Sequence, residues 1–411
     1  MSLTANVVIA GGGMVGISLA LHLAASLPRS QSITLIESYP LRGGNGDYHP
    51  SFDARSTALS YSSRLIYEGL GLWQALSAWA EPIRHIHVSS QGRFGSSLMD
   101  ADDQGWPGLG YVVENAWLGR VLLDALLASS RIQLVSPASA VAAKPRDGRM
   151  EISLDTGEPG ALAADLLVIA DGAQSRLRDG LGIGVNSRRY DQHALVANVA
   201  FAAPHAGVAY ERFTAAGPLA LLPLPPTADA PNRAALVWTL PEARAQELAA
   251  AEPAAFLQEL QETFGYRLGR AVQVGERSTY PLSLVEAREC VRRHVVVVGN
   301  AAHALHPVAG QGFNLALRDI AALSAVLAQA ITGGDTAGDP AVLARYAARQ
   351  RVDQQRTIAA SDRLPGLFMN ADPVFGLARD LALSGLDLAR GAKSAFVRHA
   401  AGVAALEARN A

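Results

Sequence analysis

The chain of 411 residues contains a single cysteine, Cys290. One cysteine excludes an intramolecular disulfide framework and a CxxC redox pair, and it makes a reducing compartment the simplest setting. An excess of one charge is also lacking, since 35 Lys and Arg stand against 37 Asp and Glu. No basic tract with interleaved aromatic residues occurs, so a nucleic-acid partner is not expected.

Long apolar runs are missing as well. No uninterrupted run reaches about 18 residues, so no membrane-spanning helix is expected. The N-terminus lacks the basic region of a signal peptide, and these absences together predict a cytoplasmic protein. Hydrophobic residues make up 49% and charged residues 18% of the chain, which is typical of a globular protein. A chain of this length is too long for one simple core, so two or more lobes are expected.

The first forty residues have the pattern of a nucleotide-binding unit. The apolar run VVIA precedes GGGMVG, a helical apolar tract follows, and ITLIE then ends at Glu37. In this GxGxxG pattern Gly11 allows a tight turn, Gly13 lets the backbone approach a pyrophosphate, and Gly16 lets the helix pack on the strand. Glu37 lies at the interval expected for an acid that binds a ribose hydroxyl. A glycine-rich turn beside a surface glutamate is the weaker alternative, because the strand and helix context is complete.

A second strand, loop and helix occurs at residues 295–319, almost 300 residues later. Such an arrangement directs unpaired backbone N–H groups and the positive end of a helix dipole at an anionic or electron-rich ligand. Two such loops, far apart in sequence, predict one extended cofactor held at both ends. The polar or conformationally special residues of the second loop are Gly299, Asn300, His303, His306, Pro307, Gly310, Gly312 and Asn314.

Two further features have a simple structural alternative. Asp171 and Gly172 follow an apolar strand, and an Asp–Gly pair at a strand end is usually only a turn. His303 and His306 have i, i+3 spacing, but they lie in a loop-like tract without a third His or a carboxylate nearby. A zinc site needs three or four ligands, so no metal is expected. Packing, or a polar contact to a cofactor, fits these histidines better.

The rest of the chain divides by pattern. Residues 188–280 show short β-rich runs separated by Pro, Gly and Asn turns, interrupted by a helical tract at 241–265. Residues 51–76 have helical spacing after Asp53, and the chain after Asn314 is almost wholly helical. The antiparallel block lies between nucleotide-type elements, which predicts a discontinuous second lobe.

Three tracts together resemble the fingerprints of the aromatic-ring flavoprotein monooxygenases: GGGMVG with Glu37, IADGAQSRLR, and GNAAHALHPVAGQGFNLALRD. The resemblance covers essentially the whole chain. Within that family, FDARSTALS, YVVENAWLGRVLLDAL and PLALLPLP are similar to the ubiquinone-biosynthesis hydroxylases, most of all to the 2-polyprenyl-6-methoxyphenol branch. The Gly–Asn pair that replaces the usual Gly–Asp of the third tract is mild support for that branch.

The resemblance implies an α/β fold: a Rossmann-like FAD-binding domain, an inserted antiparallel-sheet substrate domain, and a C-terminal helical segment. The FAD-binding domain would comprise residues 1–80, 111–185 and 281–330. The substrate domain would comprise residues 81–110 and 186–280, and the C-terminal helices residues 331–411.

The same resemblance assigns roles to particular residues. The pyrophosphate and ribose of FAD would contact Gly11, Gly13, Gly16 and Glu37, and two arginines, Arg55 and Arg120, would also touch the cofactor. Asp171 would serve FAD and nicotinamide handling, and Asn300 would bind the ribityl chain with an amide in place of the usual carboxylate. The isoalloxazine would be lined by Pro307, Gly310, Gly312 and Asn314.

The activity implied is hydroxylation of the phenolic ring of a polyprenylated ubiquinone precursor, with O2 and NAD(P)H as a transient reductant, through a flavin C4a-hydroperoxide. No catalytic side chain is identified, since the flavin carries the chemistry. Membrane-surface or protein-complex partners are compatible with the C-terminal helices, which carry Arg379, Arg390, Lys393 and Arg398. A solvated basic face on a core helix explains these residues equally well.

Three alternatives remain open at this point. The chain could oxygenate another aromatic compound, or it could reduce isoprenoid lipids as a flavin reductase. It could also be an FAD-binding scaffold subunit of a biosynthetic complex with little activity of its own. Asn300 is the only residue that favours the scaffold.

Overall fold

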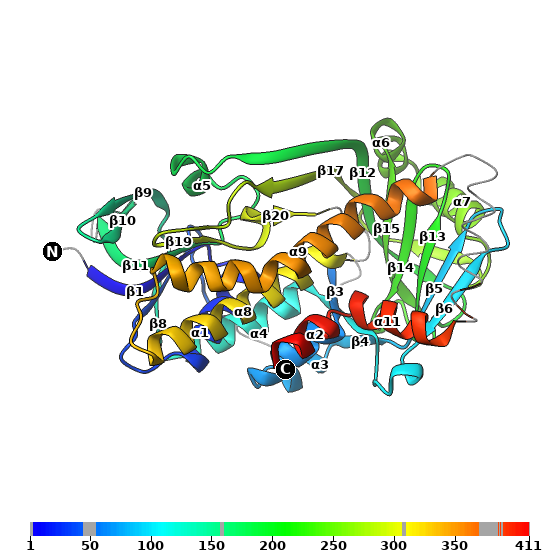
Figure 1. The fold of residues 1–411 in the computed structure, drawn as a ribbon. Helices are drawn as coiled ribbons and strands as arrows, with labels where there is room; N and C mark the ends of the chain where they lie inside the picture. The colour runs from blue at the N-terminus through cyan, green and yellow to red at the C-terminus, as the bar shows by residue number, and fades with distance from the viewer. Residues whose placement is uncertain are drawn as a thin grey trace.

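The computed structural model describes residues 3–43, 55–156, 160–305, 310–369, 385, 387 and 389–410. Two large sheets lie side by side along the molecule, and helices run over both (Figure 1). The expected α/β class is confirmed. Elements distant in sequence contribute to each sheet, so the chain crosses between the two parts of the molecule several times.

The first sheet has a parallel core in the order β19-β11-β1-β2-β8. Its strands are short apolar runs, buried on both faces as parallel sheets require. Three helices, α1 (Met14–Ser26), α4 (Asn115–Ala128) and α8 (Gln311–Thr332), pack on one face. The core strands are β1 (Leu3–Ala10), β2 (Ile33–Ile36), β8 (Ile132–Val135), β11 (Ala161–Ile169) and β19 (Val295–Val297).

Antiparallel strands continue this sheet beyond its parallel core, since β18 pairs with β19, β10 with β11 and β9 with β10, and one short helix lies beside them. Buried apolar side chains of these elements pack against β11 and β19. The elements are β9 (Ala140–Arg146), β10 (Arg149–Leu154), α5 (Arg176–Gly180) and β18 (Val291–Arg292).

The second sheet is mainly antiparallel, in the order β20-β17-β12-β15-β14-β13-β5-β6, with β16 beside β12. Helices α6 (Glu242–Ala250) and α7 (Pro253–Phe264) cover its outer face, and Pro253 starts a new helix within the tract expected to be helical. The strands are β5 (His85–Ser90), β6 (Ser96–Asp100), β12 (Val185–Phe201), β13 (Val208–Phe213), β14 (Pro218–Pro223), β15 (Arg233–Pro241), β16 (Ala271–Val274), β17 (Ser278–Ala287) and β20 (His303–Ala304).

A small third sheet corrects one expectation from the sequence. Residues 56–60, expected to be helical, form strand β3 (Ser56–Ser60), which pairs with β7 (Gly110–Glu114), and β7 also pairs with β4 (Ala80–Ile83). The helix α2 (Tyr61–Gly69) starts only after Ser60, whose hydroxyl accepts a hydrogen bond from the Ser63 amide. Pairing with a distant strand therefore overrides the local helical spacing. Asp53, the expected cap, lies outside the described residues.

The C-terminal part is helical where it is described. Helix α9 (Pro340–Met369) runs across both parts of the molecule, and α11 (Arg390–Ala400) and α12 (Val403–Asn410) return to the region of α2 (Figure 1). Two shorter elements complete the fold: α3 (Trp73–Ser77) follows α2 in the chain, and η1 (Asp102–Gln104) follows β6. Among the described residues, α8 alone is long and apolar enough to cross a membrane, but 67% of its apolar window is buried inside the protein, as in a core helix.

The expected domain boundaries stay a prediction. The sheets show which strands near those boundaries belong to the second sheet. Strand β17 belongs to the second sheet along its whole length, beyond residue 281. Strand β20 joins the same sheet from within the segment 281–330. The long strands β12 and β17 therefore extend the second sheet toward the first.

A buried ion pair joins the second sheet to the small sheet. Arg233 at the start of β15 is fully buried and lies 2.6 Å from the carboxylate of Glu114, at the end of β7. Its Nε also donates to the carbonyl of Pro225 at 2.6 Å. Removing one partner of such a pair leaves a buried charge without its counter-ion.

We therefore expect Arg233→Met to lower the free energy of unfolding by about 3–5 kcal/mol. Arg345→Met is the matched control, because Arg345 and its partner Asp335 are both about half exposed and exposed pairs contribute little. Thermal denaturation of the purified protein measures both. Equal melting temperatures for the two variants would show that the buried pair does not join the sheets.

Candidate functional site

The ends of four parallel strands lie in one row. In the register of the first sheet, Ala10 pairs with both Ile36 and Ile169, and Ile169 pairs with Val297. The loops that carry the predicted site residues begin within two residues of this row. Ligands of open α/β sheets bind at the carboxyl ends of the strands, where the strand order reverses. The reversal lies at β1, between β2 and β11.

The three glycines of the first loop serve different needs. A Cβ at Gly11, where φ is +111°, would lie 2.5 Å from the Ala170 carbonyl oxygen, and a Cβ at Gly16 would overlap the Gly11 carbonyl. A Cβ at Gly13 would meet nothing within 4 Å. Gly11 and Gly16 therefore permit close packing of backbone, whereas Gly13 borders open space at the start of α1, where no side chain caps the helix. A pyrophosphate fits that space and the free amides.

Glu37 is tied to the same loop. One carboxylate oxygen accepts the Gly12 amide at 2.6 Å, and the other accepts the Ser38 hydroxyl at 3.0 Å and the Tyr39 amide at 2.9 Å. Each carboxylate oxygen has two lone pairs, so Oε2 keeps acceptor capacity for a ribose hydroxyl. The side chain is thereby oriented beside the glycine loop before any ligand binds.

Asp171 lies against the glycine loop, since its Cα would be 2.9 Å from a Cβ at Gly11. Burial raises the pKa of its carboxyl, while a hydrogen bond from Ser175 opposes that rise. The buried Arg178 follows on α5 and donates to the carbonyls of Ala173 at 3.1 Å and Ala301 at 3.0 Å. Arg178 therefore joins the loop of Asp171 to the loop of Asn300, a role that the sequence did not suggest.

The loop after β19 packs on the start of α1. A short 3-10 turn spans Gly299–Ala301, and a Cβ at Gly299 (φ +61°) would lie 3.2 Å from Val15. Asn300 in this turn is exposed. The first and third sequence fingerprints thus lie in contact, with the Asn300 side chain directed away from the packed interior.

The N-terminus of α8 is fixed by Asn314. Its side-chain oxygen accepts the Ser60 amide at 2.8 Å and the Ser63 hydroxyl at 2.6 Å, and its amide nitrogen donates to the carbonyls of Ala58 and Gly310, both at 2.8 Å. All the hydrogen-bonding capacity of the amide is used within the protein. The side chain of Asn314 therefore positions the first turn of α8, and only the backbone of Asn314 remains for contact with a flavin ring.

Gly310 and Gly312 flank that turn. Gly310 has φ +59° and is the residue before the first turn of α8, where no side-chain cap occupies the helix end. Gly312 has no atom closer than 3.9 Å to the position of a Cβ. Both leave backbone accessible at a positive helix end. Pro307 and His306 lie outside the described residues.

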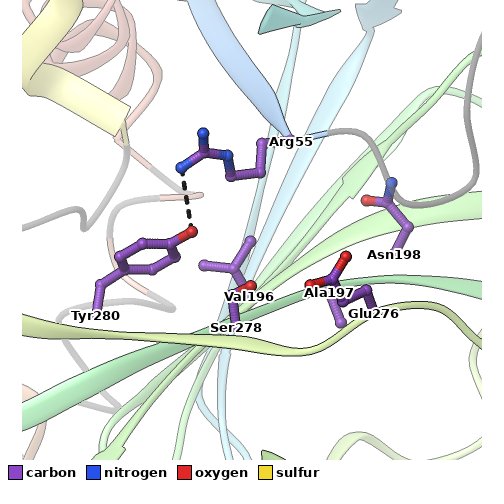
Figure 2. Close-up of a pocket in the computed structure, with 7 residues that line it drawn as sticks. All are labelled: Arg55, Val196, Ala197, Asn198, Glu276, Ser278 and Tyr280. Carbon is purple, nitrogen blue, oxygen red and sulfur yellow. Dashed lines mark hydrogen bonds between the residues drawn. The ribbon is translucent and has the colours of Figure 1, made fainter.

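Arg55 and Arg120 lie near the joint of β3 and α4. The backbone carbonyl of Arg55 accepts the Asn115 amide at 2.8 Å, which joins it to the first turn of α4. Arg120 follows on that helix, 3.8 Å from Asp124. The Arg55 side chain turns toward the second sheet and donates to the Tyr280 hydroxyl at 3.1 Å, as Figure 2 shows.

Arg55 and Tyr280 close one side of a cavity of about 290 Å³. The other walls come from β12 and from the start of β17 and the residues before it, so the cavity lies between the small sheet and the inner face of the second sheet (Figure 2). The lining residues are Arg55, Val196, Ala197, Asn198, Glu276, Ser278 and Tyr280.

Among the residues that the structure describes, His303 belongs to no group of three or more His, Cys, Asp or Glu side chains that could hold a metal. Instead it is buried beside Asp319 of α8, with 2.8 Å between Nε2 and Oδ2. Gln350 and Gln354 of α9 donate to the other oxygen of Asp319 at 2.5 and 3.0 Å. Burial alone would lower the pKa of His303, but the charge of Asp319 outweighs it and the pKa is raised.

The raised pKa sets a pH dependence of stability. His303 stabilises the fold fully below its ordinary pKa of 6.5, and this contribution is lost as pH rises through the folded-state pKa. We expect His303→Gln to cost about 3–5 kcal/mol at pH 6 and progressively less at alkaline pH. Thermal denaturation from pH 5.5 to 9 measures it.

His22 supplies a control of opposite sign. Burial lowers the pKa of His22 from 6.5 to about 4, so its contribution is present above pH 6.5 and falls as pH decreases. The destabilisation caused by His22→Gln should therefore grow with pH while that of His303→Gln shrinks. Parallel slopes for the two variants would contradict the charged His303–Asp319 pair.

Comparison with known proteins identifies the family. The family model described as FAD binding domain matches residues 4–361. The ubiquinone hydroxylase UbiL of Rhodospirillum rubrum is 35% identical over 402 residues, which cover 97% of this chain and 90% of that protein. The chain belongs to the FAD-dependent monooxygenases of ubiquinone biosynthesis. The 3-demethoxyubiquinol 3-hydroxylase of Escherichia coli is 33% identical, covering 97% of this chain and 98% of that protein. The resemblance inferred from the three fingerprints is confirmed.

Solved structures confirm the aromatic-hydroxylase fold. The p-nitrophenol 4-monooxygenase PnpA of Pseudomonas putida superimposes with a TM-score of 0.76 at 17% identity, covering 97% of both chains. PqsL of Pseudomonas aeruginosa, a probable FAD-dependent monooxygenase, gives 0.73 at 20% identity and covers 89% of this chain and 97% of that one. At these identities the likeness concerns the fold.

Proposed function

We propose that this monooxygenase hydroxylates the phenolic ring of a polyprenylated ubiquinone precursor of the 2-polyprenyl-6-methoxyphenol type, with NAD(P)H as reductant and O2 as oxidant. The observation that carries the proposal is the row of strand ends at Ala10, Ile36, Ile169 and Val297, from which all three fingerprint loops begin. The names of the relatives, which act in ubiquinone biosynthesis, support the substrate class.

The residues present suit FAD along the whole row. Gly13 and the uncapped start of α1 would hold the pyrophosphate, and Glu37 the ribose. Asn300, exposed beside the same row, would reach the ribityl hydroxyls with donors and an acceptor. The bound flavin would supply the activated oxygen. The protein would orient the ring of the substrate and exclude water from the site.

The lipid tail of the substrate suggests where the enzyme works. We infer a peripheral position at the inner face of a membrane, reached through the C-terminal helices. Helix α11 carries Lys393 and Arg398 together with Phe396, which is 43% exposed. Basic and apolar side chains on one short helix suit a membrane interface or a partner in a biosynthetic complex.

Gly13→Val tests the cofactor site. The new side chain would have room in the folded protein but would occupy the space assigned to the pyrophosphate. We expect the melting temperature of the flavin-free protein to change little and FAD affinity to fall at least roughly tenfold, or ~1.4 kcal/mol. Gly391→Val is the control, since it also meets no atom within 4 Å but lies on α11. Unchanged FAD affinity in Gly13→Val would contradict the assignment.

Turnover tests the reaction. The purified flavoprotein should oxidise NADH or NADPH faster when 2-geranylphenol is present, and mass spectrometry should find one added oxygen atom in the product. Reductant oxidation that yields reduced lipid without added oxygen would indicate a flavin reductase. Bound FAD without stimulated oxidation would favour the scaffold, for which Asn300 in place of aspartate is the one supporting observation.

A further inference from the structure

An acidic residue on the inner face of the second sheet has no ion-pair or hydrogen-bond partner among the residues that the structure describes. Glu211 is on β13, between Tyr210 and Arg212. The ring of Tyr210 contacts that of Phe264 at 5.3 Å, and Arg212 donates to the carbonyl of Thr263 at 2.9 Å. Both neighbours therefore face helix α7. Because side chains alternate along a strand, Glu211 points to the opposite face, on which Ala209 of the same strand packs with Ile83 and Val112 of the small sheet.

The register of the sheet places Glu211 in one row with the cavity. Glu211 pairs with Ala220 of β14, Ala220 with Val237 of β15, and Val237 with Val196 of β12. Val196 lines the cavity that Arg55 and Tyr280 close. Residues paired across strands share one face, and neighbouring strands are about 4.8 Å apart, so Glu211 and Val196 are separated by roughly 14 Å. Only alanine and valine lie between them.

Its surroundings offer no charged partner among the described residues. The residues paired with Glu211 on either side are Ala220 and Val88. One strand further, Ser97 donates to Asp387, which is itself paired with Lys393. Residue Glu211 is partly buried. Burial raises the pKa of its carboxyl to about 7.

Helix α9 also brings charged groups near this face. It contacts β13, and its last described charges are Asp362 and Arg363. Asp362 is held by Arg188 and Tyr190, and Arg363 is exposed. An unpaired carboxyl at such a place costs stability unless a ligand satisfies it, and groups of this kind concentrate at functional sites.

We propose that Glu211 binds the phenolic hydroxyl of the substrate and accepts its proton while the ring is hydroxylated. The inference rests on the proposed function and adds the acid–base residue that the sequence did not reveal. The phenol O–H bond breaks as electron density moves into the ring and the ring carbon gains its C–O bond. That carbon then loses its own proton to the second oxygen atom of O2, which leaves as water. Aromaticity returns, and Glu211 gives a proton back to the first oxygen. The activated oxygen comes from O2 and NAD(P)H in the proposed reaction.

The row also explains how a lipid phenol would lie. The polar end would meet Glu211, and the short apolar side chains of Ala220 and Val237 would contact the ring or the first isoprene unit. Among the described residues of this row on β12, β15, β14, β13 and β5, Glu211 is the only one with a charge. A phenol would therefore be distinguished from an ether of the same shape by one side chain.

Binding separates this inference from the proposed function. The flavin-loaded enzyme is titrated with 2-geranylphenol and with its methyl ether, 2-geranylanisole, and flavin absorbance reports the two dissociation constants. We expect the wild type to prefer the phenol at least roughly tenfold, or ~1.4 kcal/mol, and Glu211→Gln to bind both compounds about equally. This measurement needs no turnover, so it tests Glu211 even if hydroxylation fails.

Turnover adds a readout that a merely structural role would not change. Since the carboxylate is the active form, kcat/KM of the wild type should rise with pH through about 7. Glu211→Gln should lose that limb and at least tenfold in kcat/KM, and Glu211→Asp should restore the limb in part. Glu262→Gln is the control, because Glu262 is exposed on α7 behind the same sheet. An unchanged phenol preference and pH limb in Glu211→Gln would overturn the proposal.

Discussion

The burial of polar side chains along helix α8 is the constraint on which the site depends. Asn314, Arg318 and Asp319 are all at most 2% exposed, and a buried polar group is stable only when its partners are in place. Asn314 binds β3 and α2, Arg318 binds Asp353 of α9 at 2.7 Å, and Asp319 holds His303. The helix can therefore occupy one position, and its N-terminus is fixed where the flavin ring is expected.

The two ends of the proposed cofactor site, the adenosine end and the flavin end, are stabilised by different kinds of contact. At the adenosine end, backbone packs on backbone: Gly11 against Ala170, and Gly16 against Gly11. These contacts need the absence of side chains. At the flavin end, side-chain hydrogen bonds from Asn314 and Arg178 fix the loops. A substitution at the first end fails by steric overlap, whereas one at the second fails by leaving buried groups unsatisfied.

This difference explains what the sequence could predict. The proximity of Glu37 to the loop of Gly11, Gly13 and Gly16 could be predicted because the geometry is local, a strand, a tight turn and a helix within 35 residues. The pairing of His303 with Asp319 and the bonds of Asn314 to residues 58–63 depend on contacts made only in the folded chain. The helix expected over residues 56–60 was wrong for the same reason, since β7 decides that segment.

The role proposed for Glu211 cannot be predicted from the local sequence pattern. Its strand, VAYERF, reads as ordinary alternation, and no spacing in the sequence places the glutamate on the face of the cavity. The register of four strands does so, by setting Glu211, Ala220, Val237 and Val196 in one row. A row of small apolar side chains beside one carboxyl suits a ligand that is apolar along its length and has a single hydroxyl at one end. In the proposed function, the large sheet would contribute the chemical selectivity and the parallel sheet would hold the cofactor.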